Sequence, residues 1–157
     1  CWTAWRRCWQ TAAGEPHGAN KQHFVRTLRL PVKKFVILSN LSQPQTRPVV
    51  TRYCQSFLCR LRGLMFTSRL APDRGLLLVQ GRDSRLDASI HMLFMAIDLA
   101  VVWINKDQEV VDVCLAQRWR PAYVPKKPAC YVLETHPERL PDFNIGDKVS
   151  WDEAWMD

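Results

Sequence analysis

The sequence has no apolar segment long enough to cross a membrane, no internal repeat and no stretch of low complexity. Its longest apolar segment, residues 89–104, is shorter than the roughly 20 residues of a spanning helix and contains His91 and Asp98. Ten prolines and six glycines are scattered along the 157 residues. These absences argue against a membrane span, a solenoid and a linker, and they leave one domain with a full core as the expectation.

No two of the six cysteines have the C-x-x-C spacing of a zinc ribbon or a redox site. Two of them, Cys1 and Cys8, lie near the start of the chain, and the other four lie inside apolar segments (Cys54, Cys59, Cys114 and Cys130). This placement is typical of small buried side chains, and it predicts free thiols in a reducing compartment rather than a disulfide framework. The cysteines therefore favour the cytoplasm.

Residues 1–33 differ in character from the rest. The first methionine is Met65, so we expect Cys1 to follow a processed or incomplete start. Three tryptophans recur at helical spacing and would share one side of a short, partner-binding helix (Trp2, Trp5 and Trp9). Glycine and proline follow at once, which favours a poorly ordered tail instead.

The net charge of +7 is unevenly distributed. Residues 1–74 contain 13 Lys and Arg and only two acidic residues, whereas residues 75–157 contain 9 Lys and Arg and 13 acidic residues. A basic half of this kind could attract nucleic acid, anionic lipid or an acidic partner. Because the arginines stand singly among apolar residues, a solvated basic face is favoured over a nucleic-acid site.

Short segments rich in β-branched and aromatic residues, separated by turn residues, predict strands from Lys34 onward. The segments are FVILSN (35–40), VVTRYC (49–54), GLLLV (75–79), ASIHML (88–93), LAVVWIN (99–105), EVVDVCLA (109–116), ACYVLET (129–135) and KVSW (148–151). Seven or eight short strands predict an all-β fold, a single-domain β-sandwich or partly closed barrel, over residues 34–152. Residues 153–157 are the C-terminal end.

One segment has a helical pattern instead. SFLCRLRGLM places Phe57, Leu58 and Leu61 with Leu64 or Met65 on one side, and Gly63 provides a stop. We expect one short helix near 56–64 that closes an end of the sheet.

Several ordered segments together resemble the domain of unknown function 192 family. They are RLRGLMF (60–66), GLLLV (75–79), SIHMLFM (89–95), VVWINKDQEVVDV (101–113), YVLE (131–134) and IGDKV (145–149), and the resemblance extends over roughly residues 35–151. It implies a small β-rich sandwich with a short helix, and no established activity. Family members often carry a Pro-hydrophobic-Asp step where this chain has Asp98-Leu99-Ala100, so the carboxylate is displaced by two positions.

Four polar residues stand in the most apolar surroundings: Arg62, His91, Asp98 and Glu134. Burial without a partner would be unfavourable, so each is expected to have one. In a structural arrangement, Arg62 pairs with Glu134 or Asp98, and His91 bonds a backbone carbonyl. In a functional one, His91 and a carboxylate (Asp98 or Glu134) form a catalytic pair, and Arg62 orients an anionic ligand.

The segment RWRPAYVPKKPA, residues 118–129, combines Trp119 and Tyr123 with three prolines and four cations. It predicts either an exposed recognition loop for a peptide, a glycan or an acidic surface, or a crossover whose aromatic rings cover the core.

Familiar catalytic motifs are missing, and no two histidines share metal-ligand spacing, so neither a metal nor a cofactor is predicted. The biochemical function stays unknown at this level. The pattern favours a small binding or accessory module that uses Arg62, His91, Asp98 and the 118–129 loop, with a small anionic ligand or a peptide as partner. A hydrolase using His91 and Asp98 is the alternative, and a basic-face nucleic-acid binder is the weakest one.

Overall fold

The computed structural model describes residues 34–154, in which seven strands and two short helices follow one another. The elements are β1 (Phe35–Asn40), β2 (Val49–Cys54), α1 (Phe57–Arg62), β3 (Arg74–Ser84), β4 (Leu99–Ile104), β5 (Val110–Ala116), β6 (Ala129–Thr135), the 3-10 helix η1 (Pro137–Asp142) and β7 (Val149–Ala154). The tail of residues 1–33, with its tryptophans and with Cys1 and Cys8, lies outside the described residues. Neither helix of residues 34–154 has the length and apolar character that a membrane crossing requires.

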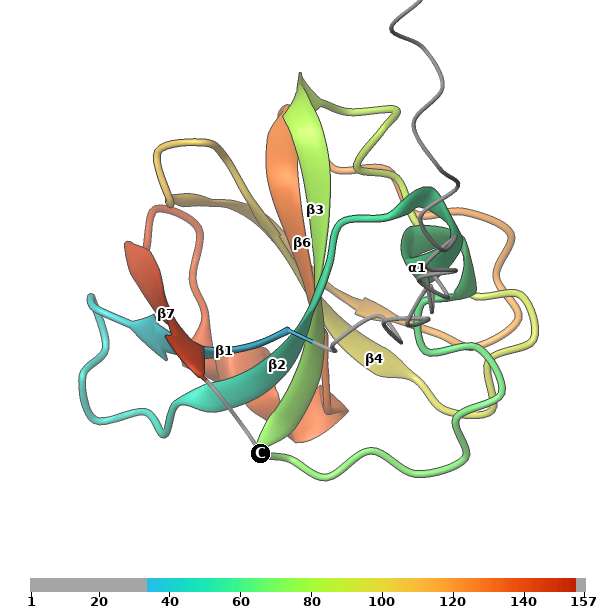
Figure 1. Cartoon of the computed structure of the whole chain (residues 1–157), viewed down its shortest axis with the longest axis horizontal. Helices are drawn as coiled ribbons and strands as arrows, with labels where there is room; N and C mark the ends of the chain where they lie inside the picture. The colour runs from blue at the N-terminus through green and yellow to red at the C-terminus, as the bar shows by residue number, and fades with distance from the viewer. Residues whose placement is uncertain (1–33, 155–157) are drawn as a thin grey trace, which may run out of the picture. The chain divides into compact units, whose positions relative to one another are not determined.

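The strands form one curled sheet in the order β5-β4-β6-β3-β2-β1-β7 (Figure 1). All neighbours are antiparallel except β2 and β3, which are parallel because the connection between them passes through α1. Beside the outermost strands, Glu109 forms an isolated bridge with Lys148, and the Lys148 Nζ lies 3.0 Å from the Glu109 carboxylate. The predicted mainly β fold is confirmed, as a half-closed barrel.

Seven of the eight predicted strands are present, and the prediction for ASIHML (88–93) is wrong. That segment forms only a single bridge, between Ile90 and Tyr123. Its apolar side chains still enter the core, since Ala88, Ile90 and Met92 are buried. The alternation therefore reflects packing against the sheet as a covering loop rather than strand pairing.

The central strands β3, β4 and β6 are buried on both faces, which explains their continuous apolar sequences. One face carries Leu76, Leu78, Val101, Trp103 and Val132, and the opposite face carries Leu77, Val79, Val102, Ile104 and Leu133. Figure 1 places α1 and the loops that follow β3 and β5 on the same side of the sheet. They cover the first face, where the Trp103 indole donates a hydrogen bond to the Ala88 carbonyl.

Helix α1 forms where the sequence predicts it. The Ser56 hydroxyl accepts a hydrogen bond from the Cys59 N–H at the start, and Gly63 takes a positive φ of 47° at the end. The helix itself buries no residue, and Phe57, Leu58 and Leu61 are exposed. Only Cys59 and the following Leu64 and Met65 pack against the core.

A disulfide joins Cys54, at the end of β2, to Cys59 in α1. The prediction of free thiols is therefore wrong at these two positions, and the cysteines no longer favour the cytoplasm. The turn into α1 places the Cα atoms of these two cysteines 5.6 Å apart, a separation that a disulfide can bridge. Cys114 and Cys130 are free thiols.

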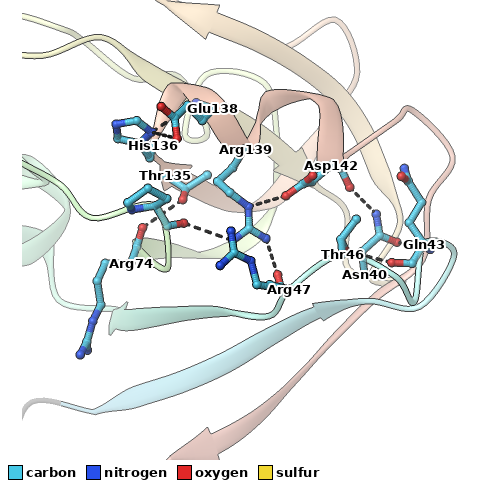
Figure 2. Close-up of polar contacts among 11 residues, drawn as sticks. Asn40, Gln43, Thr46, Arg47, Arg74, Thr135, His136, Glu138, Arg139 and Asp142 are labelled. Atoms are coloured by element: carbon cyan, nitrogen blue, oxygen red, sulfur yellow. Dashed lines mark hydrogen bonds and ion pairs between the residues drawn. The ribbon is translucent and has the colours of Figure 1, made fainter.

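On the other side of the molecule, Arg139 of η1 ties three segments together (Figure 2). Its buried guanidinium donates hydrogen bonds to the Asp142 carboxylate and to the main-chain carbonyls of Pro72 and Arg47. Asn40 completes the connection by donating to the Asp142 carbonyl. The whole arrangement is internally satisfied, as expected of a buried charge with an architectural role.

Candidate functional site

A cavity of about 610 Å³ lies between α1, the covering segment around His91 and the sheet. Its apolar wall comes from the helix exit, the sheet and the covering loop (Leu64, Met65, Leu78, Ile90, Met92 and Met95). Polar side chains also line it (Arg60, Arg62, Gln80, Arg82, Asp87, Ser89, His91 and Glu134). An apolar concavity with a few converging polar groups is the usual form of a small-molecule site.

Glu134 is the most deeply buried ionisable group of this cavity, with 5% of its surface exposed. Cross-strand pairing sets Glu134 of β6 beside Leu76 on one side and Val101 on the other, so its side chain points to the covered face. Its Oε2 has no hydrogen-bond partner. The turn after α1 packs closely here, since a Cβ added at Gly63 would lie 3.5 Å from that oxygen.

Burial raises the pKa of the Glu134 carboxyl to about 7, although the positive charge of Arg52 acts in the opposite direction. A carboxyl in this state is present in both protonation forms near neutral pH. It can therefore accept a hydrogen bond as a carboxylate or donate one as an acid.

Arg52 of β2 lies on the same face of the sheet as Glu134, two strands away, because β3 stands between β2 and β6. It pairs with Leu76, the residue that pairs with Glu134, so the three side chains form one row on one face. Its guanidinium donates to the Gly63 carbonyl over 3.3 Å, while its buried Nε has no partner. Arg52 could not be predicted from the sequence, because nothing in VVTRYC distinguishes it from an outward-facing strand arginine.

His91 lines the cavity from the covering loop and is half-buried. Its Nδ1 is buried and has no hydrogen-bond partner. Among residues 34–154, three buried side-chain nitrogen or oxygen atoms have no hydrogen-bond partner: His91 Nδ1, Arg52 Nε and Glu134 Oε2. All three of these atoms thus belong to side chains in or beside one cavity.

The arginines around the cavity differ in their hydrogen-bond and ion-pair partners. Arg60 is committed to the protein, because it donates to Gln80 Oε1 at 2.7 Å and to the Val79 carbonyl at 3.0 Å. Arg62 is exposed and forms no ion pair with any described residue, so the predicted pairing with Glu134 or Asp98 is wrong. The cation beside Glu134 is Arg52, and Arg62 has a free guanidinium at the rim.

Asp98 lies in a different cavity, of about 510 Å³, together with Arg69, Arg118 and His136. Its carboxylate accepts a hydrogen bond from the Arg118 N–H at 2.8 Å. The chain does turn between His91 and Asp98, where Phe94 has a φ of 60°, but the turn leads the two side chains into separate cavities. His91 thus shares its cavity with Glu134 rather than with Asp98.

The 118–129 loop separates its two aromatic residues. Trp119 is exposed, with its ring 5.8 Å from that of Phe94. Tyr123 packs against the core, exchanges backbone hydrogen bonds with Ile90 and accepts one from the Gln117 N–H on its hydroxyl. The loop therefore combines both arrangements that the sequence allows, covering the core with Tyr123 and exposing Trp119.

The fold and the cavity define a small, mainly β domain with a partly polar cavity that opens to the surface. The family model for the uncharacterised proteins DUF192 ("Uncharacterized ACR") matches residues 40–151, and the chain belongs to this family. The resemblance noted in the sequence is thereby confirmed. The family has no established activity, so membership defines the fold without naming a reaction.

Relatives and solved structures agree with this assignment. The chain is 42% identical to a UPF0127 protein of Thermococcus gammatolerans over 62% of this chain and 63% of that protein. It is 33% identical to a UPF0127 protein of Pyrococcus furiosus over 71% of this chain and 95% of that protein. A crystal structure from Sinorhizobium meliloti, described as a candidate transcription regulator, has a TM-score of 0.65 and 23% identity, covering 76% of this chain and 93% of that one. At that identity it shares the fold alone.

Proposed function

We propose that this domain is a small-molecule-binding module whose ligand occupies the cavity of Glu134 and His91. The observation that carries the proposal is a cavity lined by His91 and Glu134, two side chains that each keep a buried polar atom without a hydrogen-bond partner. Leaving such an atom without a hydrogen bond costs about 1–3 kcal/mol, so native proteins keep few of them. These atoms have almost no solvent-accessible surface, so a ligand would supply the missing partners once the side chains that cover them rotate, and it would then recover this energy.

The lining indicates the chemistry of the ligand. An apolar body fits against Leu78, Met92 and Met95, and a hydroxyl, amide or acid group would meet Glu134 and His91. The free guanidinium of Arg62 at the rim favours an anionic group at the outer end. The small anionic ligand expected from the sequence therefore stays as the proposed partner.

A general acid–base enzyme is the second candidate. Its support is the pKa of Glu134 near 7, which suits proton transfer at neutral pH, beside an imidazole in the same cavity. Because Asp98 lies elsewhere, Glu134 takes the role of the carboxylate in this reading. Conversion of a bound probe, lost in Glu134→Gln, would favour the enzyme over the binding module.

A thermal-shift assay with benzoate, hexanoate, phenyl phosphate and benzyl alcohol tests the binding proposal. A probe at 100 times its Kd should stabilise the protein by about 2.7 kcal/mol, which is readily measured. We expect the shift to disappear in His91→Ala and in Glu134→Gln, because each change alters one of the interior partners. The matched control is Asp98→Asn, the same carboxyl-to-amide change in the other cavity, which should keep the shift.

Two outcomes would contradict the proposal. One is a probe-induced shift that survives both His91→Ala and Glu134→Gln. The other is a shift lost equally in Asp98→Asn, which would place binding outside this cavity.

A further inference from the structure

Exposed apolar side chains lie on α1 and on the segments beside the cavity. We call them the apolar face: Phe57, Leu58, Leu61, Phe66, Phe94 and Trp119, each between 50 and 74% exposed. Phe57 and Leu61 line the cavity, and so do Met65 and Met95, the chain neighbours of Phe66 and Phe94. The aromatic members are in contact, with ring centroids 6.0 Å apart for Phe66 and Phe94 and 5.8 Å apart for Phe94 and Trp119.

The backbone holds these rings outward in an unfavourable conformation. Phe66, Phe94 and Trp119 have φ values of 63°, 60° and 65°, in the left-handed region that bulky residues rarely adopt. Two backbone hydrogen bonds fix them, from the Phe66 N–H to the Phe94 carbonyl and from the Trp119 N–H to the Met92 carbonyl. Such conformations persist only where the surrounding structure enforces them, and they concentrate at functional surfaces.

Cations outnumber acids in the segments that carry the apolar face. The segments that carry it and cover the cavity, residues 55–72, 88–98 and 117–128, contain seven Lys and Arg and a single acidic residue, Asp98. The rest of residues 34–154 contains nine Lys and Arg and twelve Asp and Glu. Of the nearby carboxylates, Asp98 accepts a hydrogen bond from the backbone N–H of Arg118, and Asp87, which lines the cavity, is paired with Arg82 at 3.1 Å. The complement of this surface is therefore anionic.

We propose that the apolar face docks on the surface of an anionic lipid bilayer. Phenylalanine, tryptophan and leucine side chains beside arginines are the composition that inserts at the boundary of headgroups and acyl chains, with arginines against the anionic headgroups. Leu58 and Leu61 favour lipid over single-stranded nucleic acid, because an aliphatic side chain can enter acyl chains but offers no ring for base stacking. Docking would also turn the cavity mouth toward the bilayer.

Co-sedimentation of the full chain with vesicles tests the docking. We expect binding to vesicles of phosphatidylcholine and phosphatidylglycerol, roughly tenfold weaker binding to phosphatidylcholine alone, and further weakening by salt. Leu58→Ser and Phe94→Ser should each reduce binding several-fold. The matched controls are Leu41→Ser and Ile145→Ser, which change similarly exposed apolar residues outside the three segments and should leave binding unchanged.

The outcomes separate this proposal from its alternatives. Equal binding by all four variants, which would place the contact on another part of the chain, overturns it. Failure to bind anionic vesicles overturns it as well. A third contrary outcome is that the chain binds a single-stranded oligonucleotide, and that Leu58→Ser and Phe94→Ser abolish this binding but leave vesicle binding unchanged. If Phe94→Ser fails to fold, Leu58→Ser in the exposed helix decides. Glu134→Gln should bind vesicles like the wild type, so the docking stands or falls independently of the cavity ligand.

Discussion

Arg139 and Glu134 are both buried and ionisable, and they stand five positions apart in the chain, yet their surroundings are opposite. Arg139, 6% exposed, donates to a carboxylate and two carbonyls. Glu134, 5% exposed, has an oxygen without any partner and faces a cavity. A buried charge whose hydrogen bonds are complete supports the fold, whereas one left incomplete beside a cavity is available to a ligand.

Arg139→Ala should produce the largest loss of stability, about 3–5 kcal/mol, because it leaves the Asp142 carboxylate and two carbonyls without their donor. Urea unfolding followed by circular dichroism measures it. Arg47→Ala is the matched control: Arg47 contributes its carbonyl to the cluster and its side chain is exposed, so the loss should stay within about 0.5 kcal/mol. Similar losses of stability in both variants would contradict the claim that the buried Arg139 side chain supports the fold.

Glu134→Gln should raise the free energy of unfolding, opposite to Arg139→Ala, and the size of this effect should depend on pH. The pKa of Glu134 is raised from 4.5 to about 7, so the folded state holds the proton more tightly than the unfolded chain. The contribution of Glu134 to the free energy of unfolding should therefore be fully present below about pH 4.5, decrease by about 3 kcal/mol as the pH rises to about 7, and then level off. Glutamine cannot ionise, so the variant should lack this fall.

Urea unfolding at several pH values compares the two proteins. Asp98→Asn serves as the control for a carboxyl outside the cavity and should keep the wild-type fall. Parallel pH profiles for wild type and Glu134→Gln would show that Glu134 is not held in an unfavourable state.

The disulfide should have a smaller effect. Cys54→Ser with Cys59→Ser removes the covalent tie between β2 and α1, and closure of so short a loop is worth about 2 kcal/mol. Cys114→Ser is the control, because burial raises the pKa of this free thiol to about 11 and keeps it unreactive. Because α1 forms one wall of the cavity, the double variant should also weaken probe binding in the thermal-shift assay, whereas Cys114→Ser should not.

Most of the fold could be predicted because its signals are local. Alternation and turn residues identified seven strands, and Ser56 with Gly63 identified α1. The covering segment 88–93 was mistaken for a strand, since Ile90 and Met92 enter the core with the same alternation while pairing only at Ile90. Local pattern does not distinguish a covering loop from a strand when both bury every second side chain.

The candidate site could be predicted only in part. His91 and Glu134 stand out as polar residues in apolar sequence, and the structure places both in one cavity. Arg52 joins them only through the parallel pairing of β2 with β3 and the register of β3 with β6. No local pattern shows such long-range pairing. The separation of Asp98 from His91 follows instead from the turn at Phe94, whose direction the sequence does not specify.

The most direct test of the account is a ¹³C NMR titration of the Glu134 side-chain carboxyl in the full chain, with the signal assigned by its loss in Glu134→Gln. A carboxyl that is buried and incompletely hydrogen-bonded should titrate with a midpoint near pH 7. Binding of a probe that satisfies its free oxygen should move that midpoint. A midpoint near 4.5, unchanged by every probe, would mean that Glu134 is solvated or paired, and it would contradict the assignment of this cavity as a binding site.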